Sequence, residues 1–198
     1  MAEAALGILR PSRGATLFED LTEASAPSAA QPLLAKTREI FGFAPALAVA
    51  MAAEPAALEG YLQALGAFLQ TGLTPIEQQI VLMTASRAND ADYSVAVHAS
   101  FAEKLGAAPK IIAAAGNGRP IADTKLRALQ RFVEALTLRR GRVPEAEIDE
   151  ILAAGYDRAA IVAAAFGVAV KIFANAMAHL ARPEIDAGFA PALARLGR

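Results

Sequence analysis

From Leu33 to Leu180, apolar residues recur at the three- and four-residue spacing of helices, and this periodicity most limits what the chain can fold into. No stretch shows the sustained alternation of apolar and polar residues that marks a half-buried strand. The expected helices cover residues 33–41, 45–52, 55–71, 75–89, 92–105, 108–115, 122–140, 144–154 and 157–181. The pattern therefore predicts an all-α bundle of about seven to nine helices.

Residues that begin and end helices support these boundaries. Thr74, Pro75 and Glu77 form an N-cap, a proline in the first turn and the glutamate of a capping box. Gly106 follows one predicted helix as a C-terminal cap, and Asp157 is placed to cap the last long one.

Three segments are expected along the 198 residues. Residues 1–32 are rich in Ala, Ser, Pro and Thr and are predicted to be an N-terminal arm. Residues 33–182 form one helical domain, since this length supports a single sizeable core, and residues 183–198 form a C-terminal tail.

Charge and cysteine content exclude several classes of function. The net charge is −1, and the basic residues are dispersed apart from Arg139, Arg140 and Arg142, so no nucleic-acid partner is expected. The sequence contains no cysteine, which rules out disulfides, thiolate nucleophiles, zinc–sulfur sites and iron–sulfur clusters. With only two histidines, His98 and His179, no metal or other cofactor is predicted.

The apolar composition suggests self-association rather than a membrane partner. Hydrophobic residues make up 55% of the chain, which favours a homo-oligomer that buries some of this surface between subunits. The first ten residues lack the basic segment of a signal peptide. The longest apolar run, from Ala159 to Val170, is shorter than the roughly 18–20 residues that span a bilayer and is interpreted as a core helix. A cytoplasmic location is expected.

Residues 74–98 carry the most chemical information. They are predicted to form a helix, a tight break at Asn89 and Asp90, and a second helix. Ser94 and His98 are four residues apart on the second helix, so their side chains share one face. Gln79 lies on the preceding helix and approaches this pair if the two helices pack antiparallel.

This stretch resembles the alkylhydroperoxidase D (AhpD)/carboxymuconolactone decarboxylase family. That family carries a glutamate and, twelve residues later, the first cysteine of Ser-x-x-Asn-x-Cys-x-x-Cys-x-x-x-His. Here Ser86-Arg87-Ala88-Asn89-Asp90 matches the approach, and His98 matches the histidine. Ala91 and Ser94 occupy the cysteine positions, and Gln79 occupies the glutamate position.

Further matches extend the resemblance to residues 40–182. They are Phe41-Gly42-Phe43-Ala44-Pro45, Leu73-Thr74-Pro75, Lys104-Leu105-Gly106, and the hairpin from Val143-Pro144-Glu145 to Gly155-Tyr156-Asp157. The resemblance implies an AhpD-like helical bundle and a trimer or hexamer built on the site helices.

In the resembled family, the cysteine pair reduces a peroxide or a partner peroxidase, while the glutamate and histidine relay protons. Serine cannot cycle through sulfenic acid and disulfide, and alanine has no reactive group. We therefore predict that the peroxidase, or peroxiredoxin-type antioxidant, activity of this family is lost. What remains is a degenerate site of Gln79, Ser94 and His98, with Ala91 beside it, that binds a small molecule.

Each of these residues also has a structural interpretation. His98 is either a general acid/base or a core histidine bonded to a helix carbonyl or to Ser94. Ser94 is expected to be a small polar replacement for cysteine, because a nucleophile would also need an orienting acid and an oxyanion hole. Gln79 is either a binding amide or a surface residue. His179 and Tyr93 are expected to be structural.

Two alternative functions stay open. The first is a cysteine-independent decarboxylase-type lyase acting on a carboxylated lactone, with His98 as acid/base and Arg87 as the nearest candidate to hold the carboxylate. The second is a non-catalytic oligomeric scaffold, which bulky side chains filling the region around His98 would favour.

Overall fold

The computed structural model describes residues 17, 18 and 20–198, and the parts of the predicted arm at 1–16 and 19 lie outside this range. Within it, the secondary structure is helical. The elements are η1 (Ser28–Ala30), α1 (Gln31–Phe41), α2 (Ala46–Met51), α3 (Pro55–Phe68), α4 (Pro75–Ala88), α5 (Asp92–Lys104), α6 (Pro109–Gly116), α7 (Thr124–Leu138), α8 (Glu145–Ala153), α9 (Arg158–Ala181) and α10 (Ala190–Arg195). The predicted all-α fold is confirmed, and each of the nine predicted helices corresponds to one of α1–α9.

The predicted caps form as the sequence requires. The Thr74 hydroxyl accepts a hydrogen bond from the Glu77 backbone N–H, and the Glu77 carboxylate accepts one from the Thr74 N–H, completing the capping box of α4. Asp157 caps α9 by accepting from the Ala160 N–H. Gly106 takes a φ of +78° after α5, a conformation that glycine adopts without steric cost.

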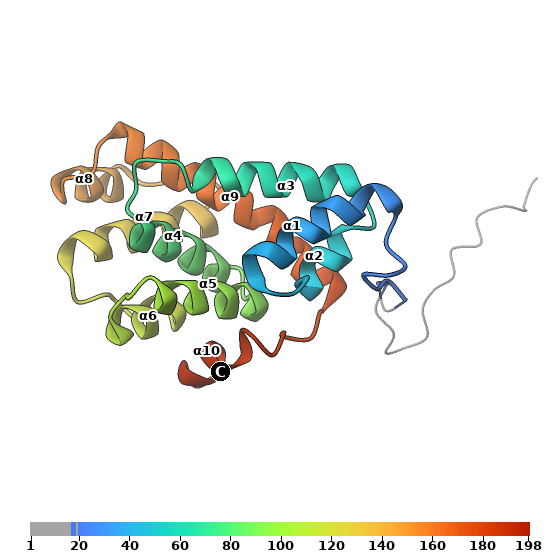
Figure 1. The fold of residues 1–198 in the computed structure, drawn as a ribbon. Helices are drawn as coiled ribbons and strands as arrows, with labels where there is room; N and C mark the ends of the chain where they lie inside the picture. The colour runs from blue at the N-terminus through green and yellow to red at the C-terminus, as the bar shows by residue number, and fades with distance from the viewer. Residues whose placement is uncertain (1–16, 19) are drawn as a thin grey trace, which may run out of the picture.

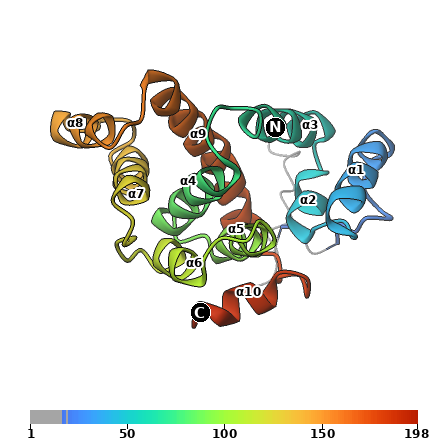
Figure 2. The ribbon, with the colours of Figure 1, turned by 60° about the vertical axis from the view of Figure 1, so that its left-hand side comes forward.

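Helix α4 is the centre of the bundle. Residues 77–86 are all buried, because α5, α6, α7 and α9 surround the helix (Figures 1 and 2). A helix that is buried on every side does not have its apolar residues confined to one face. Gln79 is therefore buried, as are its polar neighbours Gln78 and Glu77.

A smaller helical layer covers one side of this bundle. Helices α1, α2 and α3 pack on one another, and α2 and α3 also pack against α9. In Figure 2 this layer stands apart from α6, α7 and α8, on the opposite side of α4. Its apolar residues form a second core cluster with Tyr93, Ala174 and Ala178. The gap between the two clusters is the location of the site described below.

Helix α9 runs through both clusters. Its 24 residues are long and apolar enough to cross a bilayer by length and composition, but it packs here against α2, α3, α4, α5 and α7 as a core helix. A Cβ at Gly167 would lie 2.7 Å from both Phe68 and Val81, so only glycine allows this close approach. The helix continues through Lys171 as predicted, although the unbroken apolar run of the sequence ends there.

The C-terminal segment is more ordered than a tail. Helix α10, which the sequence analysis did not predict, packs on α5 and places Phe189 and Leu193 in the main core. Just before it, Asp186 accepts a 2.5 Å hydrogen bond from the Tyr93 hydroxyl and a 3.2 Å bond from the Ala46 N–H. These bonds tie residues 183–189 to α5 and to the start of α2.

Candidate functional site: a buried pocket beside His98

A cavity of about 380 Å³ lies between the two layers. Its walls come from α1, α2, α3, α4, α5 and α9, and most of its lining is apolar, including Phe41, Leu62, Leu82, Val97 and Phe101. A pocket of this size with a few convergent polar groups is typical of small-molecule sites. The polar groups on its inner wall are supplied by Gln79, Ser94, His98 and Lys171.

Gln79 and His98 form a hydrogen-bonded pair across the α4–α5 interface. The Nδ1 atom of His98 lies 3.1 Å from Oε1 of Gln79. An amide oxygen only accepts, so with this amide orientation Nδ1 carries the proton and Nε2 is left as an acceptor. Among the described residues Nε2 has no partner, although it is buried. The packing of α4 against α5 thus brings the two side chains together.

Ser94 lies one turn before His98 on the same wall of the cavity. Its hydroxyl is buried, and within the described part of the chain it has no hydrogen-bond partner. No Ser94–His98 bond forms, so His98 does not activate the hydroxyl in this state. A buried polar group without a partner costs free energy, which a ligand can recover by bonding to it.

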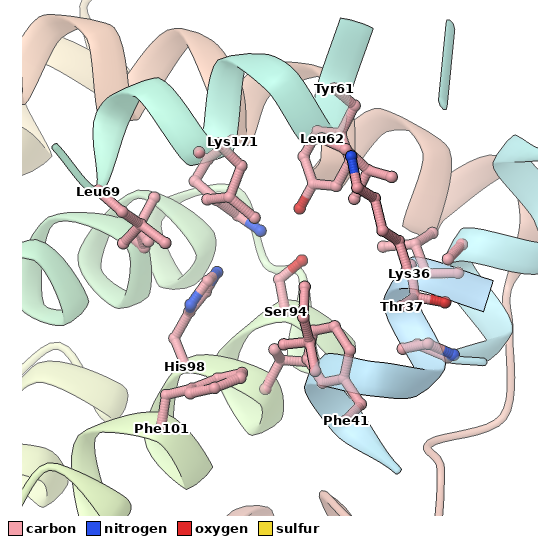
Figure 3. A pocket seen from close by; sticks show the side chains of 18 of the residues that line it. Lys36, Thr37, Phe41, Tyr61, Leu62, Leu69, Ser94, His98, Phe101 and Lys171 are labelled. Atoms are coloured by element: carbon pink, nitrogen blue, oxygen red, sulfur yellow. The ribbon is translucent and has the colours of Figure 1, made fainter. Parts of the chain in front are cut away.

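Lys171 adds a buried amine to the same wall. The residue is only 2% exposed, and no carboxylate within the described range forms an ion pair with it. Figure 3 shows its amine directed toward the space between Tyr61, Ser94 and His98. Lysine is rarely buried without a partner, so this position is unusual for a residue with a purely structural role.

Burial decides the charge of both basic groups. It lowers the pKa of Lys171 from its ordinary value to about 7. It also lowers the pKa of His98 well below its usual range, and the nearby Lys171 charge lowers it further. At neutral pH His98 is therefore an uncharged imidazole, and a substantial fraction of Lys171 is an uncharged amine.

The cavity opens to solvent between α1 and α3. Lining residues at this edge are exposed, including Lys36 and Ile40 on α1, Gly66 on α3 and Leu69 directly after α3. Tyr61 stands deeper on α3, and burial raises the pKa of its hydroxyl to about 12, so it remains a hydrogen-bond donor. A ligand can thus enter past an apolar rim and reach polar groups at the inner end.

The other predicted site residues lie outside the cavity. Ala91 precedes α5 as its N-cap residue and is buried, but it does not line the pocket. Arg87 forms an ion pair with Asp90 at 3.0 Å and does not reach the pocket either. Of the two positions that correspond to the cysteines of the family, only position 94 therefore has its side chain in the cavity wall.

Tyr93 and His179 have structural bonds, as expected. The Tyr93 hydroxyl donates a hydrogen bond to the Asp186 carboxylate and accepts one from the Leu47 N–H. His179 Nε2 lies 2.7 Å from the Asn89 carbonyl oxygen at the end of α4. Tyr93 also contributes to the cavity wall.

Sequence analysis missed Lys171 and Tyr61. A signal for Lys171 was present, because a single charged residue interrupts an apolar helix that resumes with Ile172 and Phe173. Tyr61 gave no signal, since one tyrosine in a helix is ordinarily a packing residue.

Fold and site together define an all-helical protein with an apolar pocket lined by amine, imidazole and hydroxyl groups, in a chain without thiols. Residues 52–135, from the end of α2 into α7, match the carboxymuconolactone decarboxylase family. The matched range includes the helices that carry Gln79, Ser94 and His98, and this match confirms the resemblance inferred from the sequence. No curated protein matches the chain.

Solved structures share the whole fold at low sequence identity. A cysteine-to-alanine form of the debrominase Bmp8, in complex with 2,3,4-tribromopyrrole, gives a TM-score of 0.76 at 20% identity over 92% of this chain and 98% of that chain. An AhpD-core, peroxidase-related protein from Ralstonia eutropha JMP134 gives 0.76 at 19% identity over 85% and 90%. A peroxidase-related protein from Silicibacter sp. TM1040 gives 0.75 at 18% over 92% and 97%. These similarities establish an AhpD-like fold.

Proposed function

We propose that this protein binds a small, largely apolar molecule with a polar end in the cavity beside His98, and that this binding replaces the thiol chemistry of its family. The observation that carries the proposal is a pair of buried polar atoms, Ser94 Oγ and His98 Nε2, that have no partner among the described residues and lie on the wall of a cavity of about 380 Å³. Polar atoms placed in this way lose nothing when a ligand enters and gain hydrogen bonds when it offers matching groups.

The shape of the pocket supports a ring-sized ligand. Aromatic side chains of Phe41 and Phe101 line it, with ring centroids 5.4 Å apart in an edge-to-face arrangement. The debrominase of the same fold was crystallised with a halogenated pyrrole, a small aromatic ring. A planar apolar body with one polar substituent fits such surroundings.

A pair of glycine variants tests the proposal. Gly66 on α3 lines the cavity, whereas Gly60 on the same helix lies outside it, and a Cβ at either position finds open space. Gly66→Leu narrows the opening of the cavity. Gly60→Leu raises the helix propensity of α3 by the same amount but adds no side chain at the opening.

Binding of 2-naphthalenemethanol can be followed by its fluorescence, because the chain has no tryptophan. We expect saturable binding to the wild type and to Gly60→Leu, and at least tenfold weaker binding to Gly66→Leu. Absence of saturable binding to the wild type, or equal affinities for the two variants, would refute the proposal.

Loss of thiol peroxidase activity is the second part of the proposal. The protein has no thiol, and the Ser94 hydroxyl cannot be oxidised and reduced in turn. Purified protein should leave an organic hydroperoxide unconsumed. Turnover that disappears in Ser94→Ala or His98→Ala would overturn this part.

A lyase acting on a carboxylated lactone is the second candidate. The neutral imidazole of His98, with Nε2 free toward the cavity, suits proton transfer in an apolar pocket. Lys171 replaces Arg87 as the group placed to hold a carboxylate, because Arg87 lies outside the cavity. Incubation with 4-carboxymuconolactone tests this activity, and unchanged absorbance would count against it.

A filled region around His98 would have favoured the scaffold alternative, and the cavity argues against it. We also propose that the protein is a homo-oligomer, a trimer or hexamer. Large apolar residues on α9 are exposed in the single chain, with Val162 at 68%, Ile172 at 55% and Leu180 at 62%. Light scattering that gives the mass of one 20.5 kDa chain would refute this.

A further inference from the structure

Among the described residues Lys171 is the one buried lysine, and none of them provides a counter-charge for it. Its amine projects from the middle of α9 into the inner end of the cavity. The hydroxyls of Tyr61 and Ser94 and the His98 imidazole face it from the other walls (Figure 3), and the Gln79 amide is a further polar group of the lining. The acidic side chain on the cavity lining, Glu59, is exposed at the outer edge of α3.

A lysine that serves only as a positive charge is ordinarily held beside a carboxylate, which keeps it protonated. The surroundings of Lys171 instead favour the uncharged amine, because they are apolar or neutral. Desolvation in a hydrophobic pocket is the means by which enzymes prepare a lysine to react as an amine nucleophile. Its lowered pKa, about 7, is consistent with an amine that is available near neutral pH.

We propose that Lys171 captures an aldehyde or ketone in this cavity as an imine. The inference rests on the small-molecule binding proposed above and adds the chemical class of the ligand. The ligand would have a carbonyl group at the end of an aromatic or aliphatic body that the Phe41 and Phe101 side of the cavity accommodates.

The chemistry is balanced without an oxidant or reductant. The amine lone pair forms a C–N bond to the carbonyl carbon, the C–O π pair moves to oxygen, and the nitrogen proton passes to that oxygen to give a carbinolamine. The hydroxyl then leaves with a second proton as water, and the C=N bond forms. Nε2 of His98, the free acceptor, takes the proton from nitrogen and returns it to the departing hydroxyl. Hydrogen bonds from the hydroxyls of Ser94 and Tyr61 can polarise the carbonyl oxygen.

Reductive trapping tests the inference. The protein is incubated at pH 7.5 with 2-naphthaldehyde and cyanoborohydride, which reduces an imine to a stable secondary amine, and the labelled peptides are identified by mass spectrometry. Lys104, Lys110 and Lys125 are exposed and lie outside the cavity, so they serve as internal controls, whereas Lys36 is exposed at the cavity opening.

We expect labelling at Lys171 to be at least tenfold faster than at any exposed lysine, and to slow when 2-naphthalenemethanol occupies the cavity. Lys171→Met should abolish this fast labelling, whereas Lys110→Met should leave it unchanged. Methionine fills a similar volume and should fold, and protection by the alcohol tests the site in the wild type, independent of any variant.

The outcomes separate this inference from the proposed function. If the alcohol binds but Lys171 is labelled no faster than the exposed lysines, imine capture is refuted and the binding site stands. A second result would also refute imine capture and leave the binding site in place: 2-naphthoate binds at least tenfold more tightly than the alcohol, and the aldehyde leaves no adduct. Lys171 would then act as a carboxylate anchor. If neither alcohol nor aldehyde binds, the proposed function itself fails.

Discussion

The buried amine of Lys171 makes a quantitative prediction about stability. In the folded protein its pKa is about 7, against an ordinary value of 10.5. Between these values the unfolded chain binds a proton that the folded chain does not, so folding becomes more favourable as the pH rises. Below the folded pKa the penalty for burying Lys171 is complete, and above 10.5 it is absent.

The size of the effect follows from about 1.4 kcal/mol for each pKa unit. Lys171 should cost the fold about 4 kcal/mol at pH 7 and about 2 kcal/mol at pH 9. Lys171→Met has no such penalty. Its stability advantage over the wild type should therefore shrink by about 2 kcal/mol between these two pH values.

Urea denaturation of both proteins at pH 7, 8 and 9, followed by far-ultraviolet circular dichroism, measures this difference. Protein concentration must be constant, since an oligomer gains stability with concentration. Taking the difference between two proteins removes the contributions of groups that titrate alike in both. A stability difference that is independent of pH would refute the reasoning, because it would mean that Lys171 is paired or hydrated in the folded state.

Three further substitutions test the bonds that position the site. Gln79→Glu places a carboxylate at Nδ1 of His98 and should raise the pKa of that imidazole by at least one unit, measured by NMR titration; an unchanged titration would mean that the pair is not formed. Thr74→Ala removes the cap of α4 and should lower the free energy of unfolding by about 1 kcal/mol in urea denaturation, whereas no loss would show that Glu77 maintains the cap alone. Tyr93→Phe leaves the Asp186 carboxylate without its 2.5 Å donor and should cost about 1–3 kcal/mol, with faster amide exchange in α10; equal exchange would contradict the proposed tie to the C-terminal segment.

The helical class and the limits of the helices were predictable because they depend on local interactions. Proline and a capping box begin α4, an aspartate caps α9, and glycine with positive φ follows α5. Each of these signals acts within a few residues of the chain, so the sequence displays it directly. Helix α10 was missed because it is short and depends on packing against α5 rather than on its own periodicity.

The site was predictable in part, because a spacing of four residues places Ser94 and His98 on one helix face without any knowledge of the fold. The family resemblance then added Gln79 from the preceding helix. Whether these side chains meet across a cavity or a filled core depends on the volume left between α3, α5 and α9, and no local pattern contains that volume.

The sequence by itself determined an all-helical chain without thiols, with Ser94 and His98 on one helix face, because periodicity, caps and composition are properties of the chain. Only the tertiary structure decided that Lys171 is buried, without an ion pair to any described residue, and faces the same cavity as His98. In the sequence this lysine marks the end of an apolar run. Its burial and its lowered pKa arise only when helices far apart in the chain pack around it.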